Sequence, residues 1–225
     1  MRQQWVIPPK QNADFVAKME DVLDVYARPY DEDYPVICFD EKPYQLLDER
    51  TEPIPMKEGQ PVRYDNEYER MGTCCIFVTT EPLKGRHYAM AKQRRTAIDY
   101  AHYLDWLANE SPYKNAKKII LVQDNLNTHN TASLYKAFPA ERAREIVRKF
   151  EFHYTPRHGS WLNIAEIAIS ILQKQCIARR IADIETLNKE LAAWETDNNA
   201  NCKSIRWQFT AEKARVRLRS LYPVF

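Results

Sequence analysis

The sequence predicts an α/β protein in which a mixed, five-stranded sheet carries helices on both faces. Two short runs without a polar residue, 36–39 and 119–122, are typical of strands buried on both sides at the centre of a sheet. Two further β-rich segments are joined by a turn, and helical and strand patterns alternate after them. A leading hairpin followed by alternating elements favours a mixed sheet.

The first half of the chain is expected to supply one helix and three strands. Apolar residues recur at helical spacing over 13–27, and Pro29 lies just beyond them. The expected strands are 36–39, 73–80 and 86–91, of which the last two are joined by a turn at 82–85. Residues 48–70 are polar and interrupted by prolines, which predicts an irregular excursion or a small hairpin.

The second half is expected to alternate helices with strands and to end in a helical tail. Thr96 is predicted to cap a helix that ends before Pro112. The remaining expected elements are a strand at 119–122, a helical stretch at 131–149 broken at Pro139, a strand at 150–154, and helices at 162–178, 183–194 and 210–221. The chain therefore divides into an N-terminal helix and linker (1–34), a central domain (35–180) and a C-terminal helical extension (181–225).

Composition excludes several classes of protein. Apolar residues make up 44% and charged residues 28%, as in ordinary globular domains, and no stretch approaches the roughly 18 apolar residues of a membrane span. The first residues lack the apolar core of a secretory signal, so we expect a cytoplasmic protein without a membrane partner. The five cysteines include no C-x-x-C pair, which disfavours a zinc ribbon and indicates reduced, mostly buried thiols.

Basic residues are clustered in two places, although the formal net charge is only +2. One cluster comprises Lys92, Arg94 and Arg95. The other lies in residues 203–219, where six basic residues stand against a single acid, Glu212. The six are Lys203, Arg206, Lys213, Arg215, Arg217 and Arg219. Such clusters either form a solvated face or contact the phosphates of a nucleic acid.

Three carboxylates occupy positions that favour a functional role. Asp40 and Asp124 each follow one of the two apolar strands, at the strand end where α/β proteins place their sites. Glu166 lies in a helix that is apolar nearly all round, where burial of an unpaired carboxylate would be costly. Bound Mg²⁺ or Mn²⁺ would remove that cost, because such hard ions prefer oxygen ligands. The alternative is that each acid is a helix cap or a surface residue.

The sequence around these acids resembles three motifs of bacterial insertion-sequence transposases of the insertion sequence six-thirty family, which is related to mariner-like elements. The motifs are Cys38 to Glu41 (CFDE), Gln123 to His129 (QDNLNTH) and Tyr154 to Glu166 (YTPRHGSWLNIAE). The resemblance runs from about Val36 to about Ala178. It implies a ribonuclease-H-like fold and cut-and-paste transposition of double-stranded DNA into TA target sites.

Carried over residue by residue, the resemblance implies that Asp40, Asp124 and Glu166 are catalytic and bind two Mg²⁺ or Mn²⁺ ions. Asn125, His129, His158 and Asn163 would lie near the site. The residues expected to contact DNA are Lys92, Arg94, Arg95, Trp161, Arg206, Arg215 and Arg219. Trp161 would either stack on a base or pack within the protein.

The implied partners are the transposon ends and the target DNA, so the protein would be associated with the nucleoid. Because transposition brings two ends together, a homodimer on DNA is also expected. The amphipathic helix at 183–194 would either serve such a dimer or pack on its own core.

Two departures from the family pattern are visible. Ile164 stands where many relatives have proline, which alters the start of the helix but not its carboxylate. About 35 residues precede the first strand, too few for the two helix-turn-helix modules that read transposon ends in this family. We therefore expect this polypeptide to recognise end sequences weakly or not at all.

Three other functions stay open at this stage. A nuclease of the same fold would cleave DNA without joining strands. A transposase-derived binding protein would hold DNA without chemistry, although it would not need to bury Glu166. An unrelated α/β domain would use the three acids structurally and would have no metal site.

Overall fold

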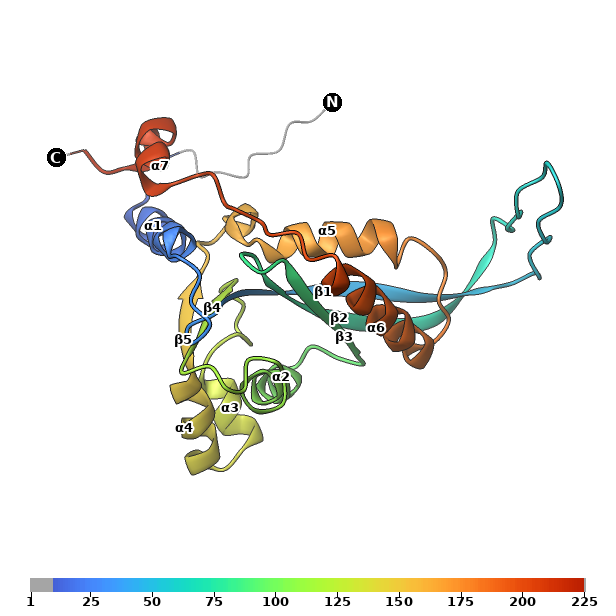
Figure 1. The fold of residues 1–225 in the computed structure, drawn as a ribbon, viewed down its shortest axis with the longest axis horizontal. Helices are drawn as coiled ribbons and strands as arrows, with labels where there is room; N and C mark the ends of the chain where they lie inside the picture. The colour runs from blue at the N-terminus through green and yellow to red at the C-terminus, as the bar shows by residue number, and fades with distance from the viewer. Residues whose placement is uncertain (1–9, 225) are drawn as a thin grey trace.

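A computed structural model describes residues 10–224, and a five-stranded mixed sheet lies at its centre (Figure 1). The strands are β1 (Val36–Glu49), β2 (Tyr68–Glu81), β3 (Arg86–Lys92), β4 (Ile119–Gln123) and β5 (Phe150–Tyr154). They lie in the order β3-β2-β1-β4-β5. β1, β2 and β3 are antiparallel neighbours, whereas β4 runs parallel to both β1 and β5. The predicted fold class is confirmed, because this is the strand order of a ribonuclease-H-like sheet.

Helices cover both faces of the sheet (Figure 1). One face carries α2 (Ala97–Asn109), α3 (Ala132–Ala137) and α4 (Ala140–Lys149), and the other carries α1 (Ala13–Ala27), α5 (Ala165–Gln175), α6 (Ile184–Ala200) and α7 (Ala211–Arg217). Alternate residues of β1 serve the two layers: Ile37 and Phe39 pack in the layer of α2, and Cys38 packs in that of α1. The strand carries no polar residue here because both of its faces are buried.

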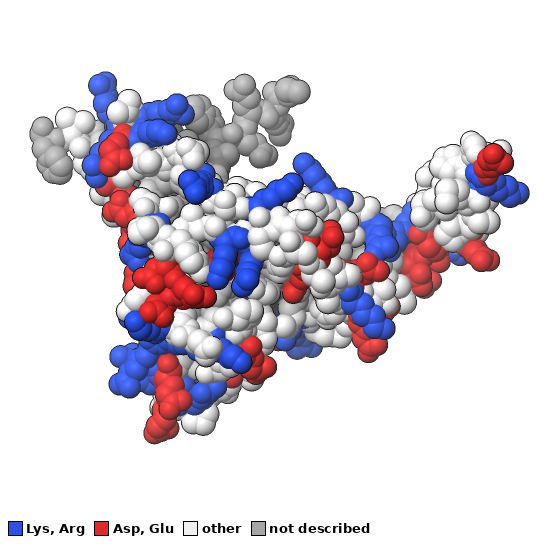
Figure 2. Space-filling model, in the orientation of Figure 1, with Lys and Arg blue, Asp and Glu red and all other residues white. Residues whose placement is uncertain are grey.

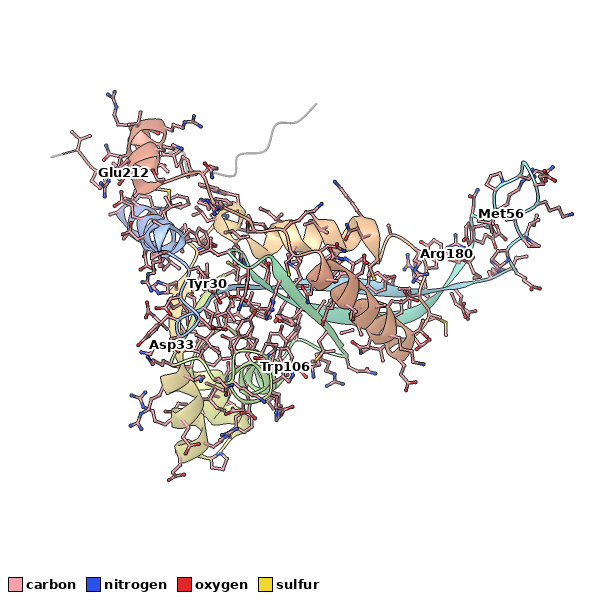
Figure 3. The ribbon with its side chains drawn as sticks, viewed as in Figure 1. Tyr30, Asp33, Met56, Trp106, Arg180 and Glu212 are labelled. Atoms are coloured by element: carbon pink, nitrogen blue, oxygen red, sulfur yellow. The ribbon has the colours of Figure 1, made fainter. Side chains whose placement is uncertain are left out.

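β1 and β2 continue beyond the body of the sheet as a long two-stranded arm (Figure 1). The strand predicted at 36–39 is 14 residues long, because its pairing with β2 continues after its pairing with β4 has ended at Cys38. Residues 50–67 form the tip, where the isolated bridges Ile54–Arg63 and Lys57–Gln60 confirm the hairpin alternative. Met56 lies at this tip and is 76% exposed (Figure 3).

Several predicted boundaries are shifted by local geometry. α2 begins at a capping box formed by Thr96 and Asp99, and Pro139 separates α3 from α4, as predicted. α5 is shorter than the predicted 162–178, because Ser160–Leu162 form a separate 3-10 turn. α7 ends at Arg217, and a second 3-10 turn follows it at Arg219–Leu221.

Two further findings concern the described helices and the cysteines. No helix within residues 10–224 combines the length and the apolar character needed to cross a membrane. Cys38, Cys74, Cys75 and Cys176 are buried free thiols, whereas Cys202 is exposed.

α6 continues past the predicted end at 194 and covers the edge strand β3. The Asn188 side chain accepts from the Ala91 N–H at 2.8 Å and donates to the Ala91 carbonyl at 3.2 Å. Asn199 makes the same pair of bonds with His87, both at 2.8 Å. Polar residues of α6 thus satisfy backbone groups that an edge strand would otherwise leave open. This helix therefore packs on its own domain, one of the two expected roles.

We expect Asn188→Ala to lower the free energy of unfolding by about 1–3 kcal/mol, because it leaves two backbone groups of Ala91 without partners. Urea denaturation followed by circular dichroism measures this difference. Lys189→Ala, at an exposed position on the same helix, serves as the control. Equal stability of the two variants would contradict the role assigned to α6.

Candidate active site

The candidate site forms where the parallel strands β1 and β4 separate. Their last paired residues are Cys38 and Val122, so Asp40 and Asp124 each lie two residues further along adjacent strands. Cys38 and Val122 both pack in the layer that contains α1 and the start of α5. Strand alternation, carried two residues further, directs Asp40 and Asp124 towards the same layer. Glu166 approaches from the first turn of α5.

Asp124 and Glu166 lie close enough to Asp40 to influence its ionisation. Burial raises the pKa of Asp40 to about 7, and the negative charges of Asp124 and Glu166 add to the increase. The opposing effect comes mainly from the Glu41 N–H, which donates to Asp40 Oδ1 at 2.7 Å. Asp40 therefore sits at a point where negative charge is poorly compensated, which favours a proton or a cation there.

His129 joins Asp124 to Glu41 beneath the site. Its side chain is 1% exposed, with Nδ1 2.5 Å from Asp124 Oδ1 and Nε2 3.1 Å from Glu41 Oε1. Burial opposes the charged imidazolium, but the hydrogen bonds to both carboxylates raise the pKa of His129 to about 9. Burial also opposes ionisation of Asp124, yet the bond with His129 brings the pKa of Asp124 below its ordinary value. Asp124 is thus held ionised, with Oδ1 engaged by the imidazole.

Asn163 ties the start of α5 to β1. It is buried, and its Nδ2 donates to the Phe39 carbonyl at 2.9 Å and to Asp40 Oδ2 at 3.2 Å. Its Oδ1 accepts from the Ala165 N–H at 3.2 Å, and its carbonyl accepts from the Glu166 N–H at 3.1 Å. Asn163, two residues before the helix, therefore fixes the position of Glu166 relative to Asp40 through its side chain and its carbonyl.

The prediction that Glu166 is buried is wrong. Only one side of α5 packs on the sheet, through Ala165, Ala168 and Leu172, whereas Glu166 is exposed and Ile167 is 38% exposed. Apolar residues all round the helix do not bury it, because some of them face solvent. Consistent with this geometry, no three His, Cys, Asp or Glu side chains within residues 10–224 are already gathered as a metal site.

The other predicted near-site residues lie around this edge in different settings. Asn125 and His158 are exposed, and His158 has a positive φ of 64° in the loop before α5. Trp161 packs edge-on against Phe209, with ring centroids 5.8 Å apart, which is the packing alternative for this residue.

The predicted basic clusters divide between the site and the fold. Arg95 reaches the site, where its Nη1 lies 3.8 Å from Glu41 Oε2. Arg215 binds Glu20 through two N–H groups at 2.8 and 2.7 Å and so holds α7 against α1. The remaining members lie on the surface or partly so: Lys92, Arg94, Lys203, Arg206, Lys213, Arg217 and Arg219.

Glu41 and Gln123 are further site residues that the sequence pattern does not predict. The Glu41 side chain is 3% exposed and accepts from His129, and Gln123 is buried between the Tyr100 hydroxyl and the His129 carbonyl. Glu41 Oε1 holds the His129 imidazole in place, and Gln123 Nε2 holds the His129 backbone carbonyl. The signal in the sequence was their position: Glu41 and Gln123 are polar residues that come just after the apolar runs 36–39 and 119–122.

The comparison with protein families identifies the class. Residues 35–188 match the model described as DDE superfamily endonuclease, which is more than half of the chain. The chain therefore belongs to the DDE superfamily endonucleases. A search of curated proteins finds no match.

Similar solved structures share the fold. The Mos1 mariner paired end complex with Mn is 16% identical over 88% of this chain and 59% of that chain, with a TM-score of 0.53. The Mos1 Strand Transfer Complex is 17% identical over 87% and 58%, with a TM-score of 0.56. The pre-cleavage Mos1 transpososome is 14% identical over 100% and 67%, again at 0.56. This chain thus spans about three fifths of the first of these relatives, and at such identities the likeness is one of fold.

We expect Asp40→Asn to stabilise the metal-free protein increasingly as pH rises from about 4 to about 7. Folding raises the pKa of the Asp40 carboxyl from 3.8 to about 7. Such a group stabilises the fold fully below pH 3.8, and this stabilisation is lost as pH rises through about 7. The asparagine variant lacks this loss. Urea unfolding over a pH series, with the exposed Asp197→Asn as control, measures it. A difference from wild type that does not change with pH would contradict the assigned environment of Asp40.

Proposed function

We propose that this chain is the catalytic domain of a DNA transposase of the insertion sequence six-thirty family. The observation that carries the proposal is the placement of Asp40, Asp124 and Glu166 where β1 and β4 separate, in a chain of the DDE superfamily endonucleases. The raised pKa of Asp40 supports it, because the increase comes from burial and from the nearby negative charges of Asp124 and Glu166. Three carboxylates also form the hard oxygen donor set that suits Mg²⁺ or Mn²⁺.

The residues have distinct roles in the proposed mechanism. Asp40, Asp124 and Glu166 would hold two Mg²⁺ or Mn²⁺ ions, which supply activation of the attacking oxygen and stabilisation of the leaving oxygen. His129 keeps Asp124 ionised and oriented, so that its second oxygen is presented to the site. Glu166 is exposed in the first turn of α5 and is therefore free to turn towards Asp40.

The proposed reaction has two steps at one site. Water hydrolyses a phosphodiester at the transposon end, and the freed 3′-hydroxyl then attacks a phosphodiester of target DNA at a TA site. Both steps are in-line displacements at phosphorus. Arg95, at the site, and the surface residues Lys92, Arg94, Arg206 and Arg219 would contact phosphates and contribute affinity that falls with salt.

The domain division and the assembly are part of the same proposal. Residues 35–180 form the catalytic unit, 1–34 supply α1 and its linker, and 181–225 supply helices that pack on the sheet and on α1. Two copies would meet on DNA, because two transposon ends must be joined to one target.

We expect Asp124→Ala to reduce Mg²⁺-dependent cleavage of DNA to background while the far-ultraviolet circular dichroism spectrum stays unchanged. The variant removes one proposed ligand and the partner of His129. Nicking of supercoiled plasmid in Mg²⁺ or Mn²⁺ measures the effect, and Asp197→Asn is the exposed control. Wild-type cleavage rates in Asp124→Ala would refute the catalytic assignment.

A second assay separates a transposase from a simple nuclease of the same fold. A pre-cut duplex that ends in a 3′-hydroxyl is offered together with a labelled target plasmid. The proposal predicts covalent joining of the two, detected as slower migration on a denaturing gel. Cleavage without joining under the same conditions would favour the nuclease.

We expect His129→Gln to weaken Mn²⁺ binding by about 10- to 100-fold, the usual effect of removing a group that orients a metal ligand. Electron paramagnetic resonance of free Mn²⁺ measures the affinity without any need for turnover. His102→Gln, at an exposed position on α2, is the matched control. Unchanged affinity in His129→Gln would show that the imidazole does not position Asp124 for a metal.

A further inference from the structure

An open groove of about 1050 Å³ runs along β1 from Lys42 to the root of the arm. Its walls are β1 beyond the catalytic region and the end of α5 with the segment that follows it. Residues that line it include Lys42, Tyr44, Tyr64, Gln173, Arg179 and Arg180. Figure 3 places Arg180 where the arm leaves the body, and Figure 2 shows basic and acidic side chains side by side there.

Each wall carries a proposed catalytic residue at its end nearest the site. Asp40 and Lys42 are two residues apart on β1 and so lie on the same face of the strand. Glu166 and Gln173 are seven residues apart on α5, which is about two helical turns, and so lie on the same side of the helix. The groove therefore begins two residues beyond Asp40 and follows β1 towards its end at Glu49, roughly 30 Å from Asp40.

The strand edge along the groove does not favour the addition of a peptide strand. Beyond Cys38, β1 is paired with β2 and no longer with β4. Pro43 lies in an unbroken antiparallel register opposite Cys75, so its missing N–H falls on the unpaired edge. The Leu47 N–H further along is already used by the Ile181 carbonyl at 3.0 Å. Few donors are left for strand addition, which depends on main-chain hydrogen bonds.

Charge and exposure favour a nucleic-acid strand instead. The lining contains three cationic side chains and one carboxylate, Glu49, but Arg179 is paired with Glu190 outside the lining. Arg180 is committed to the arm, since it binds Glu49 and donates to the carbonyls of Asp65 and Glu67 at 2.6 and 3.0 Å. Lys42 makes no ion pair within residues 10–224, and Tyr64, which also lines the groove, is 61% exposed. A free cation followed by an open aromatic face suits a phosphate and an unpaired base.

We propose that this groove binds the single-stranded DNA that continues from the scissile phosphate. Lys42 contacts a backbone phosphate, and Tyr64 stacks on a base without reading its identity. The proposal rests on the function proposed above, because that function places the scissile phosphate at the entrance to the groove. It adds a binding site for an unpaired strand beyond the site of chemistry.

The test is fluorescence anisotropy in EDTA, with a labelled duplex whose single-stranded overhang is lengthened in steps from none to about eight nucleotides. We expect affinity to rise with overhang length in the wild type. Tyr64→Ala should remove at least about fivefold of this gain, the lower bound for loss of one stacked base. Lys42→Ala should lower the slope of log affinity against log salt by about 0.7, as for one phosphate contact on a single strand.

The control is Lys136→Ala, which removes an exposed lysine from α3 on the other face of the sheet and should leave both quantities unchanged. No gain from the overhang, or a gain that survives in both Lys42→Ala and Tyr64→Ala, would overturn the proposal. The proposal would also be overturned if an extended acidic peptide bound in a Lys42-dependent manner while overhangs gave no gain in affinity. Binding is measured without metal, so the two proposals can fail separately. If the overhang raises affinity through Lys42 and Tyr64 but the protein does not cleave DNA in Mg²⁺, the result would support the groove and count against the proposed function.

Discussion

The parallel pairing of β1 with β4 ends at Cys38 and Val122, and the rest of the structure depends on where it ends. Up to that point both strands are buried on both faces and carry only apolar residues. Beyond it, β4 turns away at Asp124 while β1 continues with β2. The separation opens the sheet at its centre, which is where α/β folds place their sites. The separation also leaves one edge of β1 unpaired with β4, and this edge lines the groove.

Electrostatics at this opening depend on a second contact, the hydrogen bonds of buried His129 to Asp124 and Glu41. A positive imidazolium between two carboxylates keeps Asp124 ionised on one side of the opening. Asp40 lacks such a partner, and burial raises its pKa. The two aspartates, equivalent in their position relative to the strands, are therefore in opposite electrostatic states. That difference is the feature a divalent cation would be expected to remove.

The sequence predicts the elements and their layers well, because short apolar runs and helical spacing report burial directly. It misplaces the end of β1, since the charges at 40–42 and Pro43 end the apolar pattern while the strand continues on its pairing with β2 alone. It also misjudges Glu166, because the apolar residues of α5 do not all face the core. Glu41 and Gln123 could not be assigned, since their roles arise from contacts with His129 that depend on the folded loop after β4 and, for Glu41, on a separation of 88 residues. The polar end of α6 is likewise explained by its bonds to β3, which no local pattern reveals.

The most direct test of the account is anomalous X-ray scattering from crystals of the protein bound to DNA and soaked in Mn²⁺. The account predicts a manganese peak within coordination reach of Asp40 and Asp124, with the Glu166 side chain turned towards it. Crystals with DNA at the opening but no manganese peak there, and with the three carboxylates apart or in solvent, would contradict it.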